Sequence, residues 1–372
     1  MTAVEQVTLP DGRSVWMVSE HALARQVLGD LRLSNDTATM GDKAPLASLP
    51  STVRDVVAQD MLNTDPPQHT RLRQLVAHRF TGRSASAMRS VVDEIAERLL
   101  DGLDAATEVD LVAQYAQPLP TLVLGRMLGI PDTDCPDVRH WSETFVSEVL
   151  LVSGSLLDAT TSLLDYAGDL VRRKRREPGE DLISQLIQAN LSDDELSSMV
   201  FVLLIAGQTA TTQLIAKALY LLLTNPEQLG AVRADETLLG CAVDEALRLD
   251  PPLRVSVFRM TREPLLIGDT HIPAGEIVLC SLAAVNTDAA RFVEPGRFDV
   301  RRADNQHLSF GFGIHRCLGA NLAKVEAEAA IGALLRRHPS LRSPASTEDL
   351  RWAEAGMIMR KLIALPVRLR AG

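Results

Sequence analysis

The chain has 372 residues, of which 46% are hydrophobic and 23% charged, a balance that supports a large folded core and excludes a disordered protein. Its formal net charge of −10 argues against binding to nucleic acid or to anionic membranes. The four cysteines, at 135, 241, 280 and 317, show neither C-x-x-C pairing nor zinc-finger spacing, so we expect a protein of a reducing cytoplasm.

No linker, repeat or charge block divides the sequence, and we expect a single domain over residues 1–372. The first residues lack the basic and apolar regions of a signal peptide. The most apolar interior run, residues 199–206, is too short to span a bilayer. We therefore expect a cytoplasmic protein without a membrane anchor.

Alternating apolar residues predict a hairpin of strands at 4–8 and 14–18, followed by a short helix over 20–28. Residues 35–60 predict a loop with one short helix. From Asp65 to about residue 190 the pattern predicts helices that are interrupted at prolines. The capping box Ser192-x-x-Glu195 opens the longest periodic segment, 192–224, which predicts one helix about 48 Å long at 1.5 Å per residue.

The remaining segments predict a helix over 236–249, short strands between 253 and 283, and a helix from Cys317 to about residue 337. Strand pairs are expected near 350–370. Together these elements predict a mostly α protein with small β-sheets.

The segment 310–320 reads F-G-F-G-I-H-R-C-L-G-A and is the most informative part of the chain. Cys317 would lie at the start of a helix, where unpaired N–H groups and the helix dipole favour a thiolate that can bind a metal. The neighbouring glycines allow a tight loop against a flat ligand. For a lone cysteine, a buried and unreactive thiol next to a turn is the alternative.

The pattern Phe-x-x-Gly-x-x-x-Cys-x-Gly is complete from Phe310 to Gly319 and resembles the haem-ligand loop of the cytochromes P450. The resemblance extends in consistent order over about residues 14–370 and implies the cytochrome P450 fold, with haem b between the long central helix and the cysteine-loop helix. It implies that Cys317 binds the haem iron as a thiolate. Further haem contacts are implied for Phe310, Gly311, Gly319, Ala206 and Gly207.

His69 and Arg73 lie four residues apart, on one side of a helix that begins after Asp65-Pro-Pro67. Taken alone, the pair could be an ordinary basic surface pair. The run 65–73 resembles the family segment in which such a His and Arg bind a haem propionate, and Arg259 and His315 occupy the other two propionate-binding positions. A buried carboxylate requires partners of this kind.

Glu245 and Arg248 are three residues apart and can pair on one face of a helix. Alone, such a pair is usually a solvated surface contact. The resemblance implies that Arg297, in Pro295-Gly-Arg-Phe298, joins them in a structural network that supports the cysteine loop.

The sequence departs from the family pattern in the predicted central helix, which contains A-G-Q-T-A-T-T-Q at residues 206–213. Thr209 replaces the usual acid and Ala210 replaces the usual alcohol, so Ala210 cannot donate a proton. On an uninterrupted helix Thr209, Ala210 and Gln213 would face the haem together. We expect protons to arrive through water held by Thr209, Gln213 or a substrate hydroxyl. Alternatively, Ala210 only makes room for a bulky substrate.

The resemblance implies a monooxygenase that hydroxylates or epoxidises a small organic molecule, a secondary metabolite either free or tethered to a carrier protein. Dioxygen would be the oxidant, and a ferredoxin with its ferredoxin reductase would supply electrons near a basic surface patch, for which the candidates are Arg71, Arg79, Arg316 and Lys324. The residues expected to line the substrate pocket are Leu62, Thr209, Val255, Val257, Met357 and Ile358. Two alternatives are oxidative coupling or another reaction without oxygen insertion, and a haem-binding sensor without catalytic turnover.

Overall fold

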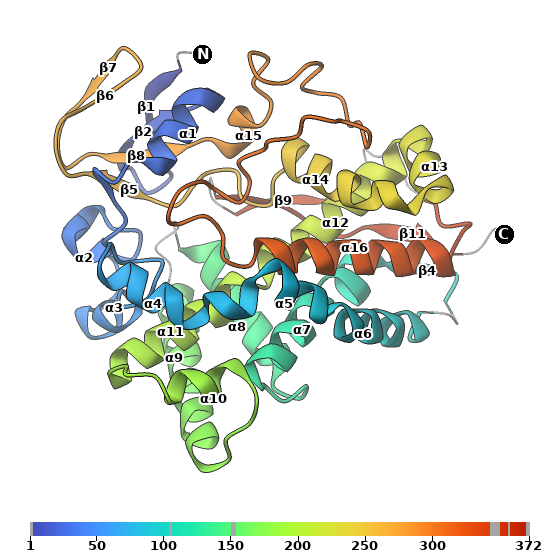
Figure 1. Ribbon diagram of the computed structural model, residues 1–372, viewed down its shortest axis with the longest axis horizontal. Coiled ribbons are helices and arrows are strands. Elements are labelled where there is room, and N and C mark those ends of the chain that lie inside the picture. The colour runs from blue at the N-terminus through green and yellow to red at the C-terminus, as the bar shows by residue number, and fades with distance from the viewer. Residues whose placement is uncertain (1–2, 104–105, 150–153, 343–349, 356–357, 370–372) are drawn as a thin grey trace.

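The computed structural model describes residues 3–103, 106–149, 154–342, 350–355 and 358–369. Helices form most of the molecule, and the strands of the largest sheet gather at one side with α1 and α15, at the upper left of Figure 1. The predicted class, mostly helical with small sheets, is confirmed.

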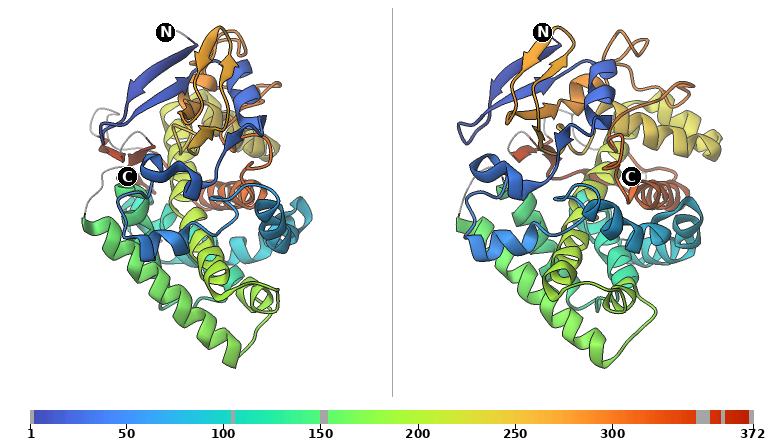
Figure 2. Two further views of the ribbon diagram at one scale, coloured as in Figure 1. Left: turned by 90° about the vertical axis from the view of Figure 1, so that its left-hand side faces the viewer. Right: turned by 60° about the vertical axis from the view of Figure 1, so that its left-hand side comes forward.

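Ten α-helices precede the central segment in the described part of the chain: α1 (His21–Gly29), α2 (Thr37–Met40), α3 (Ser51–Val57), α4 (Gln68–Ala77), α5 (Gly82–Ala87), α6 (Arg89–Asp101), α7 (Pro118–Leu128), α8 (Cys135–Glu148), α9 (Gly154–Arg176) and α10 (Leu182–Ile187). The central and later helices are α11 (Asp193–Ala206), α12 (Thr209–Thr224), α13 (Pro226–Ala234), α14 (Leu239–Leu249), α15 (Leu282–Val285) and α16 (Ala320–Arg337). Figure 2 shows the long helix α9 along one edge of the molecule, where it packs against α8 and α11.

The strands are β1 (Val4–Thr8), β2 (Ser14–Val18), β3 (Leu33–Ser34), β4 (Glu108–Asp110), β5 (Arg259–Thr261), β6 (Leu265–Ile267), β7 (Thr270–Ile272), β8 (Ile277–Cys280), β9 (Trp352–Ala355), β10 (Met359–Leu362) and β11 (Pro366–Arg368). The largest sheet has the order β1-β2-β8-β5-β3, in which β2 pairs with β8 in parallel and the other neighbours are antiparallel. Three two-stranded sheets pair β9 with β10, β4 with β11, and β6 with β7.

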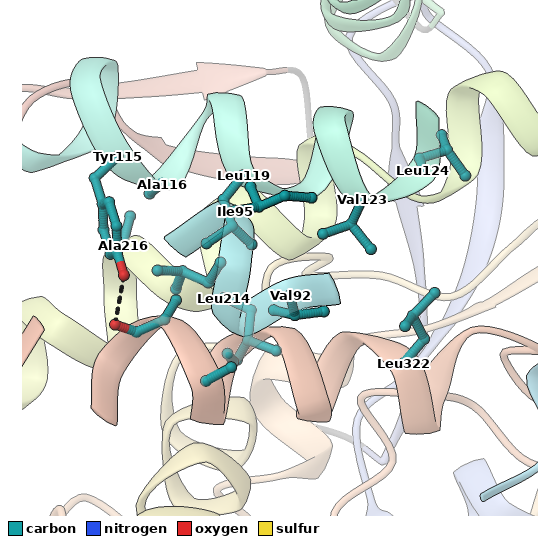
Figure 3. Packing of buried hydrophobic residues seen from close by; sticks show 14 of the residues in the cluster. Val92, Ile95, Tyr115, Ala116, Leu119, Val123, Leu124, Leu214, Ala216 and Leu322 are labelled. Carbon is teal, nitrogen blue, oxygen red and sulfur yellow. Dashed lines mark hydrogen bonds between the residues drawn. The ribbon is translucent and has the colours of Figure 1, made fainter. Parts of the chain in front are cut away.

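The main apolar core lies between α6, α7, α12 and α16, whose side chains interdigitate in Figure 3. Each fully buried leucine in such a core contributes roughly 1.5–3 kcal/mol. Tyr115 is also fully buried here, and its hydroxyl donates to the carbonyl of Ala330 on α16 over 2.8 Å, the dashed line in Figure 3. The polar tip of this aromatic ring is therefore satisfied without contact with solvent.

Most predicted elements are present, including the hairpin of β1 and β2, the helix α16 after the cysteine loop, and the capping box formed by Ser192 and Glu195. The prediction of one continuous helix over 192–224 is wrong. α11 ends at Ala206, Gly207 and Gln208 form a turn, and α12 begins at Thr209. The periodic apolar pattern continues through this break, so the hydrophobic spacing alone did not reveal it.

By length and composition, the segment Asp193–Thr224 could cross a membrane, but 78% of its most apolar window is buried inside the protein. Burial of that kind is typical of a core helix, and α11 and α12 run through the middle of the molecule in Figure 1.

Candidate functional site

The loop before α16 is shaped by two glycines with left-handed backbone, Gly311 at φ 69° and Gly313 at φ 79°. A Cβ on Gly313 would lie 2.5 Å from the carbonyl oxygen of Leu28, so the loop approaches the end of α1 too closely for any side chain. The amide of Cys317 donates to the carbonyl of Phe310 over 2.7 Å and closes the loop. Local sequence and the contact with α1 together fix the position of the cysteine.

Cys317 lies three residues before the first residue of α16, as the sequence predicted. Solvent reaches its side chain, but protein surrounds the thiol closely enough that desolvation raises its pKa. The amides of Gly319 and Ala320 and the guanidinium groups of Arg73 and Arg316 act in the opposite direction and lower the pKa. Donors and positive charges therefore surround the sulfur, as a thiolate ligand requires.

Four basic side chains converge from three parts of the chain: His69 and Arg73 from α4, Arg259 from β5, and His315 from the cysteine loop. The rings of His69 and His315 lie 4.3 Å apart between centroids. Arg73 donates to the carbonyl of Arg316 over 2.6 Å, which connects α4 to the loop. The structure thus brings together all four residues that the sequence grouped as propionate partners.

Several nitrogens of this cluster are buried without a hydrogen-bond partner in the described chain, although Arg73 donates to Arg316 and Nη1 of Arg259 donates to the carbonyl of Val27 over 3.4 Å. His69 and Arg259 are each 3% exposed. Both ring nitrogens of His69, Nε2 of His315 and Nε of Arg259 find no hydrogen-bond partner among the described residues. The backbone of Ile314 approaches His69 and opposes the fall in its pKa, but without the geometry of a hydrogen bond.

Burial has clear electrostatic consequences at this cluster. Desolvation, with His69 and Arg259 nearby, lowers the pKa of His315 to about 3. Desolvation also lowers the pKa of His69 and of Arg259. The charged forms of these side chains are therefore destabilising unless an anion binds beside them.

Two carboxylates lie nearby, and both already have partners. Arg32 pairs with Asp30, and Ser34, the amide of Asn35 and Arg262 donate to Asp65. A cavity of about 130 Å³ lies between Asp65, Arg259 and His315. Buried donors that lack acceptors beside such a space fit the carboxylate groups of a ligand, and the two propionates of a haem would satisfy them.

The break between α11 and α12 presents small residues. Ala206 is exposed although it belongs to the central segment, and Gly207 and Ala210 are half-buried. Thr209 is 4% exposed, and its hydroxyl has no hydrogen-bond partner in the described part of the chain. The side chains on this part of the break are therefore small and, at Ala206, open to solvent.

The side-chain amide of Gln213 is not free to act with this group, contrary to the prediction. Its Oε1 accepts from the amide of Leu362 over 2.8 Å, and its Nε2 donates to the carbonyl of Leu362 over 3.3 Å. Both ends of the side-chain amide are therefore used to hold β10 against α12. Thr209, Ala210 and Gln213 all lie on the continuous helix α12, so their spacing is as expected, and the hydrogen bonds to Leu362 are what occupy the amide of Gln213.

The predicted network around Glu245 exists, but its third arginine is Arg302. Glu245 and Arg248 are fully buried and joined by two hydrogen bonds of 2.8 Å. Arg302 Nε lies 3.1 Å from both carboxylate oxygens of Glu245. The side chain of Arg297 instead pairs with Glu294 at the surface, and only its carbonyl joins the network by accepting from Arg248.

Sequence reasoning also missed polar residues that extend this network to the cysteine loop. Asn286 accepts from the amide of Leu308 through Oδ1 and donates through Nδ2 to Ser309, whose hydroxyl donates to the carbonyl of Leu247. Asn305 donates to Glu245 over 3.1 Å. No local pattern marks these residues, because their partners are distant in sequence.

The predicted pocket residues are only partly brought together. The amide of Arg254 donates to the carbonyl of Ile358 over 2.7 Å, and Val255 and Ile358 share one apolar cluster. Leu62 packs against the main helical core instead. Val257 is half-buried in the same loop as Val255, and Met357 lies outside the described residues.

Three of the four candidate surface cations have partners within the chain. Arg71 pairs with Glu195, Arg79 donates to Gln185, and Lys324 lies 2.7 Å from Asp244. Arg316 is exposed beside Cys317. The carboxylates of Glu195 and Asp244 offset the charges of Arg71 and Lys324, so the predicted patch offers less positive charge.

Comparisons with known proteins show which sequences and folds this chain resembles. The profile of the family described as "Cytochrome P450" matches residues 164–351. The chain is 40% identical to "Cytochrome P450 107B1" of Saccharopolyspora erythraea, over 98% of this chain and 92% of that protein. It is 38% identical to "Mycinamicin IV hydroxylase/epoxidase" of Micromonospora griseorubida, over 98% and 92%. The crystal structure of myxobacterial cytochrome P450 CYP267B1 in complex with myristic acid superposes with a TM-score of 0.92 at 35% identity, covering 99% of this chain and 94% of that one.

Proposed function

This chain belongs to the cytochrome P450 family, and we propose that it binds haem b through Cys317 and oxidises a small secondary metabolite. Members of this family are haem-iron monooxygenases, so the protein is an oxygen-incorporating oxidoreductase. The observation that carries the site assignment is the convergence of four basic side chains beside the loop that presents Cys317, with buried nitrogens of His69, Arg259 and His315 that find no acceptor in the described chain.

The chain offers side chains for the iron and for both propionates of the cofactor. Cys317 would bind the iron, and His69, Arg73, Arg259 and His315 would hold the two propionates. Ala206 and Gly207 would face the opposite side with little bulk of their own. When bound, the haem supplies an iron at which dioxygen is activated.

Proton supply is the step that this chain must arrange differently. Ala210 has no hydroxyl, and Gln213 is engaged by Leu362. The hydroxyl of Thr209 is unpartnered within the described chain and is the remaining side-chain group of the three that can orient water. We assign proton delivery to water held by Thr209 or to a hydroxyl of the substrate.

The proposed reaction is hydroxylation or epoxidation, with electrons from a ferredoxin and its ferredoxin reductase. The name of the relative from Micromonospora griseorubida, a hydroxylase and epoxidase, supports this reaction type. We propose a cytoplasmic location, where a free or carrier-tethered substrate and the redox partners would meet.

The replacement of the alcohol by Ala210 favours one other reaction type. Oxidative coupling and related steps that insert no oxygen need less proton delivery, and they remain the second candidate. Turnover under isotopically labelled dioxygen separates the two candidates. Label in the product supports oxygen insertion, and a product without label supports coupling. Bound haem without turnover across many substrates would instead identify a sensor.

The haem assignment is tested by the carbon monoxide difference spectrum of the reduced protein. The wild type should give the spectrum of a thiolate-bound haem, and Cys317→Ser should lose it completely because an alcohol does not replace the thiolate. Cys241→Ser is the matched control, since Cys241 is an exposed free cysteine on α14. A thiolate spectrum that survives Cys317→Ser would refute the assignment.

A further inference from the structure

The turn between α11 and α12 is closed on one side by the side chain of Gln208. In an uninterrupted helix, the carbonyl of Leu204 would accept from the backbone amide of residue 208. In this structure that carbonyl accepts from the side-chain Nε2 of Gln208. The backbone of Gln208 has left the helix path, with φ −101° and ψ −72°, and its carbonyl accepts from the amide of Thr212 as α12 begins.

Two further helices fix the amide of Gln208. Its Oε1 accepts from the hydroxyl of Thr121 on α7 over 3.0 Å, and its Nε2 lies 3.3 Å from Oγ of Ser142 on α8. Ser142 in turn donates to the carbonyl of Leu204 over 3.2 Å. Every polar atom of the Gln208 side chain is therefore engaged, and the network joins α7, α8 and α11.

The network lies within the apolar core. Gln208, Thr121 and Ser142 are 1%, 4% and 0% exposed. Buried polar groups lose their hydration, so each one is destabilising unless its hydrogen bonds are made. A fully satisfied network of this kind selects one backbone arrangement over its competitors. Here the arrangement that satisfies every member is the one in which the helix is broken.

The residues on the opposite side of the turn are those that the proposed function places toward the haem. Ala206 is exposed and Ala210 is half-buried, while Gln208 is enclosed in the core. If the turn became regular helix, the backbone of 206–210 would move and the space beside these alanines would change. The size of that space limits which small molecules reach the haem from this side.

We propose that Gln208 is a positioning residue that holds the break between α11 and α12, and thereby sets the room for dioxygen and water beside Ala206 and Ala210. This inference rests on the proposed function, because the role of the space depends on haem binding there. Gln208 touches neither substrate nor reacting atoms and acts through the backbone that it anchors.

The test is the variant Gln208→Leu, which keeps a similar volume and removes every hydrogen bond of the amide. We expect a more regular helix and less room, so imidazole, used as a small probe of this side of the haem, should bind about tenfold more weakly. The carbon monoxide difference spectrum should remain that of a thiolate-bound haem, because the cysteine loop is unchanged.

Gln228→Leu is the matched control. Gln228 is also a buried glutamine, 6% exposed, and its Oε1 accepts from the amide of Val300, away from the turn. This variant should lower stability and leave imidazole affinity within about twofold of the wild type, since an unrelated buried hydrogen bond is lost. A loss of affinity caused only by general destabilisation would appear in both variants and would refute the inference.

A second variant and a second measurement make the test independent of folding yield and of haem. Thr121→Val keeps the shape of Thr121 and removes one hydrogen bond to Gln208, so it should weaken imidazole binding about threefold. Amide hydrogen exchange over 204–212 should become slower in Gln208→Leu, because regular helix protects these amides.

The outcomes separate the two claims. A wild type without a thiolate-bound haem contradicts the proposed function, and hydrogen exchange still decides the role of Gln208. Imidazole affinity within twofold of the wild type together with unchanged exchange in Gln208→Leu would show that Gln208 only fills the core. If Gln208→Leu does not fold, Thr121→Val decides by the same two measurements.

Discussion

Arg302 donates to both carboxylate oxygens of Glu245, each 3.1 Å from its Nε, and thereby replaces the predicted Arg297 in the buried network behind the cysteine loop. Glu245 also accepts from Arg248, from the amide of Asp299 and from Asn305. A fully buried carboxylate with this many donors is stable only while they remain in place.

Arg302→Ala should therefore lower the free energy of unfolding by about 2 kcal/mol, because Glu245 would lose a charged donor in a buried site. Arg297→Ala should change it by less than about 0.5 kcal/mol, since the side chain of Arg297 is half exposed and pairs only with Glu294. Urea unfolding of the two variants beside the wild type measures both values. Equal effects of the two substitutions would contradict the assignment of Arg302.

Arg259→Met should weaken retention of the haem, because it removes a buried guanidinium that the propionates would otherwise satisfy. A charge-assisted hydrogen bond contributes about 1.5–3 kcal/mol, so the haem dissociation rate should rise by about tenfold or more. Transfer of haem to an excess of a haem-free acceptor protein measures this rate. Arg172→Met on α9 is the control, as Arg172 is exposed and pairs with Asp169 on the surface. An unchanged rate in Arg259→Met would remove Arg259 from the propionate site.

Ala210→Thr should increase the share of electrons recovered in product, because it supplies the hydroxyl that this position lacks. Proton donors of this kind contribute large rate factors, and a gain of at least about tenfold is expected. Ala210→Val has the same shape without the hydroxyl and separates chemistry from space. Product and hydrogen peroxide are measured per electron supplied by a surrogate ferredoxin pair. The same result for threonine and valine would mean that Ala210 only makes room for the substrate.

The buried carboxyl of Asp60 leads us to expect that the free energy of unfolding depends on pH. Burial raises the pKa of this carboxyl to about 7 from 3.8, although the amides of Leu62 and Asn63 and the side chain of Asn63 donate to it. The folded protein thus holds a proton that the unfolded chain releases above about pH 4. The stabilising contribution of this group is present below that pH and is lost as the pH rises through about 7.

Asp60→Asn does not titrate, so it should remove this part of the pH dependence. The free energy of unfolding of the variant relative to the wild type should rise by up to about 4 kcal/mol between about pH 4 and pH 8, the value of a shift of about three pKa units. Urea unfolding at several pH values gives the difference between the two proteins, in which the other titrating groups cancel. Parallel curves for the two proteins would show that Asp60 is ionised in the fold.

Much of the site was predictable because its signals are local. The positions of Gly311, Gly313 and Cys317 before a helix follow from a short motif, and the structure places these residues in the expected loop. His69 and Arg73 could be paired because residues four apart share one face of a helix. That residues 1–372 form one domain stays a prediction.

Two predictions failed where the deciding contacts are distant in the chain. Arg297 and Arg302 lie in the same loop, and the path of that loop decides which of them reaches Glu245. Gln213 was assigned by counting positions along the helix, but its side-chain amide is held by Leu362, 149 positions away. The break at Gly207 and Gln208 was also not predicted. That break is stabilised by Thr121 and Ser142, which are 87 and 66 positions from Gln208.

The sequence by itself determined that Cys317 lies in a glycine-containing loop just before a helix, because turn-forming glycines and helix starts are signalled by neighbouring residues. Tertiary structure decided that Arg302 joins Glu245 behind that loop. It also decided that the central segment breaks between α11 and α12. Both outcomes depend on buried hydrogen bonds between distant segments. A buried polar group must form hydrogen bonds, and the packing of the whole fold determines which partners are close enough.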